Sequence, residues 1–193
     1  DETARGSAVA EVQARPGLAA LWMVGAILSF SSMAIAGRAA SAELDTFEMM
    51  TWRSFVGLVI VLLVGGFAGT LGQITRRNLG LHFFRNLAHF TGQNLWFFAI
   101  TVSPLALVFA LEFTSPLWTM VLAAIFLGER LTRIKVLAGV LGFAGVLMVV
   151  QPGAAPLSSG MVTAALAAIM FAATAIFTKK LTTTETITCI LFY

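Results

Sequence analysis

Charged side chains are scarce in this sequence. Asp, Glu, Lys and Arg make up 11% of its 193 residues, whereas a soluble domain carries roughly 25%. A helical crossing of a bilayer needs about 20 apolar residues. The scarcity of charge therefore excludes an ordinary soluble fold and predicts an all-α, polytopic bundle of transmembrane helices. The stretches without any charged residue are 16–37, 54–75, 86–111, 113–128 and 136–178.

Other absences narrow the function. The single cysteine, Cys189, excludes an intrachain disulfide, and its apolar surroundings in the sequence favour a packing role. No phosphate-binding G-x-x-x-x-G-K-[ST] motif occurs, so nucleotide-driven pumping is not expected. The basic residues form no stripe, which argues against nucleic acid as a partner. No nucleophile–base pair and no cluster of metal ligands is visible, so we predict no catalytic residue, no metal, no cofactor and no enzymatic activity.

Turn residues divide the apolar stretches into six helices and the start of a seventh. Residues 1–17 are predicted to form a tail and residues 153–159 a loop. Pro104 marks a tight turn, and Pro104 and Pro116 are expected to break or kink their helices. The chain ends within a new apolar run, so we expect it to be a piece of a longer protein. The predicted helices cover residues 18–37, 47–69, 79–102, 104–128, 134–150 and 161–181, with the seventh starting near Ile187.

The distribution of Lys and Arg predicts the orientation, because short loops rich in these residues stay on the cytoplasmic side. With the N-terminus in the cytoplasm, nine basic residues of the tail and loops fall inside, and only Arg38 falls outside. We therefore expect a multi-pass protein of the inner (plasma) membrane with a cytoplasmic tail and a periplasmic 153–159 loop. The nine are Arg5, Arg15, Arg76, Arg77, Arg130, Arg133, Lys135, Lys179 and Lys180.

An internal repeat is visible between the first and sixth predicted helices. Residues 26–35 align with 167–176, and Arg38 then aligns with Lys179. Five helices separate the two starts, so the second copy must cross the membrane in the opposite direction. Inverted repeats of this kind are typical of transporters that alternate access to a central site.

The second half of the first repeat resembles a known domain. The run from Pro104 through Pro116, the segment Gly128-Glu129-Arg130-Leu131 and the glycines at 139, 142 and 145 look like the EamA domain, the five-helix repeat of the drug/metabolite transporter superfamily. The resemblance covers residues 18–152 as one repeat and 160–193 as the start of a second. It implies a ten-helix carrier with both termini inside, whose relatives move amino acids, nucleosides, vitamins, activated methyl donors and drugs.

Two ionisable residues lie at membrane depth, where charge is expensive and usually faces a cavity or a partner. Arg53 is about 9 Å and Glu112 about 12 Å from the outer ends of their predicted helices, at 1.5 Å per residue. We expect them to pair or to line the outer half of a cavity. The alternative is a buried or snorkelling pair that only fixes helix packing.

The third predicted helix is the most polar. Asn86, His89 and Gln93 share one face, and Trp96 and Phe97 extend it. This face could bind and stack on a solute, and His89 could relay a proton. The alternative is hydrogen bonding between helices, at roughly 1 kcal/mol per contact.

Two small polar residues, Ser32 and Thr174, occupy repeat-related helices and are further cavity candidates. Small residues also simply permit close packing. His82 and Arg85 are expected to anchor the third helix at the cytoplasmic interface.

These patterns predict a secondary transporter that carries small metabolites, such as amino acids or other small organic solutes, by alternating access between inverted repeats. The expected partners are a small solute, the lipid bilayer and, as an open possibility, a coupling ion. The alternatives are a non-transporting membrane subunit and a channel-like protein. A channel usually shows a filter loop or a ring of charge, and neither is visible here.

Overall fold

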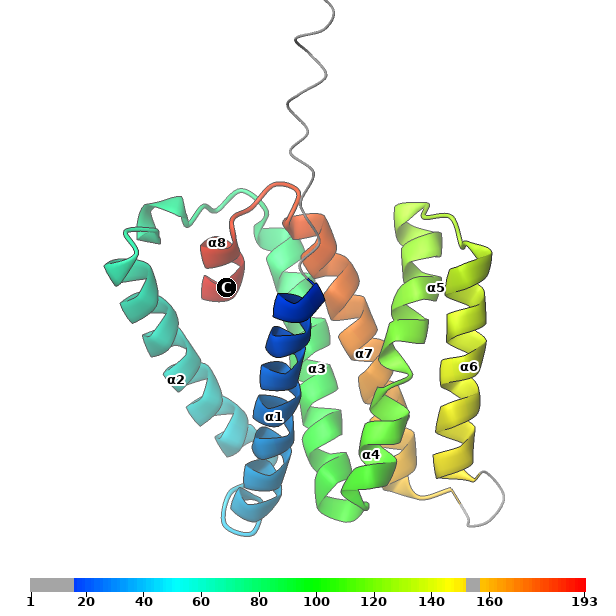
Figure 1. Cartoon of the computed structure of the whole chain (residues 1–193). Coiled ribbons are helices and arrows are strands. Elements are labelled where there is room, and N and C mark those ends of the chain that lie inside the picture. The colour runs from blue at the N-terminus through cyan, green and yellow to red at the C-terminus, as the bar shows by residue number, and fades with distance from the viewer. Residues whose placement is uncertain (1–15, 152–156) are drawn as a thin grey trace, which may run out of the picture. The chain divides into compact units, whose positions relative to one another are not determined.

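The computed structural model describes residues 16–151 and 157–193, and within them it contains helices and no strand (Figure 1). Residues 1–15 of the predicted tail lie outside this range, as do residue 152 and residues 153–156 of the predicted loop. The helices are α1 (Pro16–Ala40), α2 (Thr46–Phe67), the 3₁₀ turn η1 (Leu71–Gln73), α3 (Leu79–Val102), α4 (Leu105–Glu112), α5 (Ser115–Leu127), α6 (Arg133–Val150), α7 (Ser159–Leu181) and α8 (Ile187–Phe192).

The chain divides into two units, residues 1–36 and 37–193. The described part of the first unit is most of α1. The second unit holds the remaining helices, which alternate in direction so that the α2–α3, α5–α6 and α7–α8 connections lie at the same end of it (Figure 1). Hydrogen bonds agree with this: the α7–α8 connection meets the segment before α3, where the Asn78 amide donates to Thr184 Oγ1 at 3.0 Å.

Five described segments are long and apolar enough to cross a membrane, which confirms a polytopic helical bundle. They are residues 20–40, 46–67, 105–127, 133–150 and 159–181. The predicted crossing at 79–102 is a 24-residue helix, α3, but it is not among these segments. Its 24 residues are about 36 Å long, which is enough to cross the hydrocarbon core of a bilayer. The polar residues at positions 85, 86, 89 and 93 make it less apolar than its neighbours.

The core of the second unit is formed chiefly by α3 and α7, which pack along each other more extensively than any other pair of helices. Four alanines of α7 are buried, and small side chains let the two backbones approach closely. On the α3 side the close approach is at Gly92, where an added Cβ would lie 3.0 Å from the Cβ of Met170 and 3.1 Å from the ring of Phe171. The four alanines are Ala164, Ala167, Ala168 and Ala172.

This close approach predicts that Gly92→Ala destabilises the protein. The Cβ of Met170 is attached to backbone and cannot rotate away, so the helices must separate, and overpacking of this kind costs about 1–3 kcal/mol. Thermal unfolding in detergent measures the effect. The matched control is Gly142→Ala in α6, where an added Cβ meets nothing within 4 Å; that variant should be as stable as the parent or slightly more so. Equal stability of both variants would contradict the packing argument.

Charged side chains connect neighbouring segments at both ends of the second unit. At one end Glu129, which follows α5, pairs with Lys135 at 3.4 Å and with Lys179 of α7. The hydrogen bond from Lys179 is the largest cause that holds the pKa of Glu129 below its usual range. At the other end Arg38 donates from Nε to the carbonyl of Ile100 at 2.7 Å and from its guanidinium to Ser103. Arg38 thereby satisfies carbonyls at the C-terminus of α3, a position that favours a cation.

Candidate functional site

A break in a membrane span is the starting point of the candidate site. The crossing predicted at 104–128 is divided into α4 and α5, which agrees with the break or kink expected at Pro116. Pro116 has no N–H, so it cannot donate to the carbonyl of Glu112 four residues earlier. Thr114 instead turns back, with its N–H and its hydroxyl both donating to the carbonyl of Leu111, at 3.0 and 2.6 Å. Broken helices of this kind form solute and ion sites in transporters.

Glu112 is the last residue of α4. Its carboxylate accepts a hydrogen bond from the indole Nε1 of Trp96 on α3 at 2.7 Å, and Trp96 is 2% exposed. Glu112 thus lies at the C-terminal end of α4, where the helix dipole is negative. This arrangement favours a proton or another small cation.

Arg53 on α2 reaches the same helix. Its guanidinium donates to the side-chain oxygen of Gln93, and Gln93 is 5% exposed. Gln93 and Trp96 are three residues apart and so share a face of α3. Arg53 lies seven residues after Thr46 and Glu112 seven after Leu105, so each is about 10 Å along its helix.

Arg53 and Glu112 therefore approach neighbouring positions of α3 rather than each other. Among the described residues the ion pairs all involve Glu129, and none joins Arg53 to Glu112. We call Arg53, Gln93, Trp96 and Glu112 the α3 polar cluster. It spans α2, α3 and α4 and contains one cationic and one anionic side chain.

Of the other predicted site residues, three contact residues outside this cluster. The Asn86 amide donates to the carbonyl of Tyr193 and accepts from Arg85 at 3.0 Å. The His89 ring lies 6.1 Å from that of Phe171 on α7. The Thr174 hydroxyl donates to the carbonyl of Met170 in its own helix, at 2.9 Å. Ser32 belongs to the other unit, on α1.

The described cavities lie elsewhere in the second unit. The largest has a volume of about 540 Å³ and lies between α5, α6 and α7, with Glu129, Lys135 and Lys179 among its lining residues. An apolar cavity of about 460 Å³ reaches Leu111 and Thr114 at the break. No predicted site residue lines the cavities described here. Within the α3 polar cluster, Gln93 and Trp96 are buried, Glu112 is half-buried and Arg53 is exposed.

One residue lies in a different environment from the one its sequence position suggested. His82, expected at the membrane interface, is 2% exposed. It lies near Glu185 and Cys189. No local pattern in the sequence indicates this group, because Glu185 lies 103 positions after His82. The return of α8 towards the start of α3 brings them together (Figure 1).

Comparison with known proteins identifies the family. The EamA-like transporter family matches residues 17–151, which is most of the chain. The chain belongs to this family. The resemblance seen in the sequence is thereby confirmed, and with five membrane-length helices the chain is a multi-pass membrane protein. Members of the family and the named relatives are transporters, not enzymes.

Three relatives illustrate the range. An S-adenosylmethionine uptake transporter of Rickettsia bellii is 27% identical over 89% of this chain and 59% of its own length. A riboflavin transporter of Brucella anthropi is 28% identical over 84% and 58%. The pseudopaline exporter CntI of Pseudomonas aeruginosa is 30% identical over 66% and 44%. The chain thus spans less than two thirds of these relatives. No solved structure matches it.

Proposed function

We propose that the whole protein is a secondary active carrier of small organic solutes in the inner membrane, and that it works by alternating access between inverted repeats. The observation that carries this proposal is the α3 polar cluster beside a broken membrane span. Ionisable groups at membrane depth are rare and usually mark solute or ion pathways. The family supports the same conclusion, since its named relatives move small molecules.

The proposed repeats are residues 18–152 and a second repeat that begins at 160. In support, α7 and α8 follow the fifth crossing, α6, in the places of the first two helices of a new repeat. The proposed orientation has the N-terminus in the cytoplasm. The loops that contain Arg76, Arg77 and Arg130 share one end of the second unit (Figure 1). Arg38, at the opposite end, is engaged in capping α3.

The cluster suggests which solutes to test first. A guanidinium binds carboxylates through paired N–H groups, and a carboxylate in a low-dielectric site binds cationic groups. A solute that carries both an acidic and a basic group would match Arg53 and Glu112. The names of the relatives supply two probes, S-adenosylmethionine and riboflavin. The amphoteric amino acids supply a third class.

We further propose that Glu112 binds the coupling ion, and that this ion is a proton. A solute carrier without a nucleotide-binding motif must draw energy from a gradient. The Glu112 carboxylate at the end of α4 can bind a proton. The indole N–H of Trp96 fixes the orientation of this carboxylate. His89, the alternative relay, lies against Phe171 on the α7 side of α3.

Counterflow in liposomes containing the whole protein tests the carrier proposal. Vesicles preloaded with an unlabelled solute should take up the labelled form, at a rate that saturates with concentration. Loading vesicles in turn with S-adenosylmethionine, riboflavin and a mixture of amino acids tests the solute class. Flux that rises linearly without saturation would indicate a channel. Absence of flux for every small metabolite class, with protein correctly inserted, would indicate a non-transporting subunit.

A further inference from the structure

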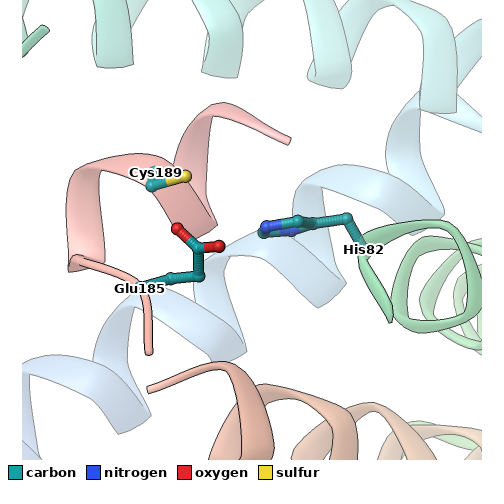
Figure 2. Close-up of side chains that lie close together, drawn as sticks. All are labelled: His82, Glu185 and Cys189. Carbon is teal, nitrogen blue, oxygen red and sulfur yellow. The ribbon is translucent and has the colours of Figure 1, made fainter. Parts of the chain in front are cut away.

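Three side chains with metal-ligating atoms meet at the end of the second unit where α3 begins. His82 comes from the first turn of α3, Glu185 from the α7–α8 connection and Cys189 from α8 (Figure 2). One ligand atom of each lies within 4.8 Å of the others. The group therefore joins the first repeat to the proposed start of the second, and it lies apart from the α3 polar cluster.

The His82 ring is the unusual member. It is 2% exposed, and neither Nδ1 nor Nε2 has a hydrogen-bond partner. Tyr193 packs against it, with ring centroids 4.6 Å apart. A buried polar group without a partner is destabilising and is rare in native structures. In Figure 2 the ring points towards the carboxylate of Glu185 and the sulfur of Cys189, so its free nitrogen faces the space that the three side chains enclose.

Hydrogen bonds from neighbouring residues orient the Glu185 carboxylate and leave it able to bind a metal ion. It accepts hydrogen bonds from the Thr75 hydroxyl at 2.7 Å and from the Asn78 amide at 2.8 Å. These bonds, with a contribution from Cys189, hold the pKa of Glu185 below its usual range, and the Thr75 bond is the largest cause. Outer partners of this kind fix ligand orientation in metal sites. The Thr75 N–H approaches the sulfur of Cys189 at 3.4 Å.

We propose that His82, Glu185 and Cys189 bind a divalent transition-metal ion, and that zinc(II) is the ion they suit best. Imidazole nitrogen, carboxylate oxygen and thiolate sulfur are the three ligand types that zinc uses. Magnesium and calcium prefer oxygen ligands alone. Zinc bonds are about 2.0–2.3 Å long, so tetrahedral ligand atoms lie about 3.3–3.7 Å apart. The three ligand atoms would need to approach one another by at most about 1 Å, and a water molecule would be the fourth ligand.

Binding would release the thiol proton of Cys189, because the thiolate is the ligand. A nucleophilic role for the same residues fits less well. A thiol activated by histidine is normally hydrogen-bonded to it. The described bonds of the Cys189 side chain go to Thr75 and Glu185 instead, and the His82 nitrogens have no hydrogen-bond partner. The bound ion would instead tie α8 to the start of α3.

Cobalt(II) spectroscopy on the purified whole protein, kept reduced in detergent, is the direct test. Cobalt bound to a thiolate gives a ligand-to-metal charge-transfer band, which excess zinc should remove by displacement. Cys189→Ser should abolish the band. Zinc affinity, measured by competition with a chromogenic chelator, should fall at least tenfold in Cys189→Ser and in Glu185→Gln. Zinc should also raise the melting temperature of the parent protein and leave that of Cys189→Ser unchanged.

The matched control is Glu129→Gln, the same change in another acidic loop residue, which pairs with Lys179 instead. This variant should keep the cobalt band and the zinc affinity of the parent. His82→Gln could fail to fold because the ring is buried, but the parent spectrum and the Glu185→Gln affinity test the site without it. A parent protein with no charge-transfer band would overturn the proposal. Zinc affinity that is equal in the parent, Cys189→Ser and Glu185→Gln would overturn it as well.

Discussion

Glu112→Gln in the whole protein is expected to abolish solute accumulation driven by a pH gradient while retaining saturable counterflow, at a higher KM because the carboxylate proposed to match the basic group of the solute is lost. Glutamine has the same shape, and its side-chain oxygen can still accept the hydrogen bond from Trp96 Nε1. It cannot bind or release a proton. A gradient of one pH unit, coupled to one proton per solute, supports about tenfold accumulation. The variant should reach a ratio of about one in proteoliposomes with an imposed gradient.

Two further variants sharpen this prediction. Glu112→Asp keeps an acid and should retain some accumulation, although the shorter side chain weakens the bond to Trp96. His89→Gln removes the alternative relay and should accumulate solute if Glu112 is the coupling group. Full accumulation by Glu112→Gln would assign coupling elsewhere, and its loss in His89→Gln alone would assign it to His89.

The helices themselves were predictable because their ends are marked in the sequence. The third predicted helix, residues 79–102, has the same bounds in the structure, and the others differ by a few residues. Turn residues and charges determine these ends, since charge is excluded from the membrane interior. Pro116 also identified the break between α4 and α5, because the missing N–H is a local property of the residue.

The partners of the polar residues were harder to predict. Matching depths suggested that Arg53 and Glu112 pair, but each bonds to a different residue of α3, Gln93 and Trp96. Depth follows from position along a helix, whereas the partner depends on how each helix is rotated. Helices that are apolar on every face carry little information about that rotation, because lipid and protein surroundings are both apolar.

The meeting of His82 with Glu185 and Cys189 lay beyond sequence reasoning for a similar reason. Each residue has an ordinary explanation in its own segment: an interfacial histidine, a loop acid and a small apolar cysteine. They are brought together by the direction in which α8 returns after α7 (Figure 1). That direction depends on packing against α2 and η1, which no local pattern describes.

Arg53→Gln is expected to lower the transport efficiency of the whole protein by about 10- to 150-fold without lowering its stability. Hydrogen bonds to charged groups contribute about 1.5–3 kcal/mol, and each 1.4 kcal/mol corresponds to a factor of ten. The loss should appear chiefly in KM if Arg53 binds the acidic group of the solute. Stability should be unchanged or higher, since an arginine near the middle of a membrane helix costs about 2.5–3.5 kcal/mol. Saturation kinetics of counterflow and thermal unfolding measure the two quantities.

Arg85→Gln is the matched control, because Arg85 is also an arginine within a helix but acts between helices. Its Nε donates to Thr178 of α7 at 3.3 Å and a terminal nitrogen donates to the carbonyl of Ile190 at 3.1 Å. Removing these bonds should lower the melting temperature, because two helices lose a common anchor. If Arg53 only fixed packing, Arg53→Gln would behave in the same way, with a lower melting temperature and an unchanged KM. Opposite signs of the stability change in the two variants would therefore separate solute binding from helix packing.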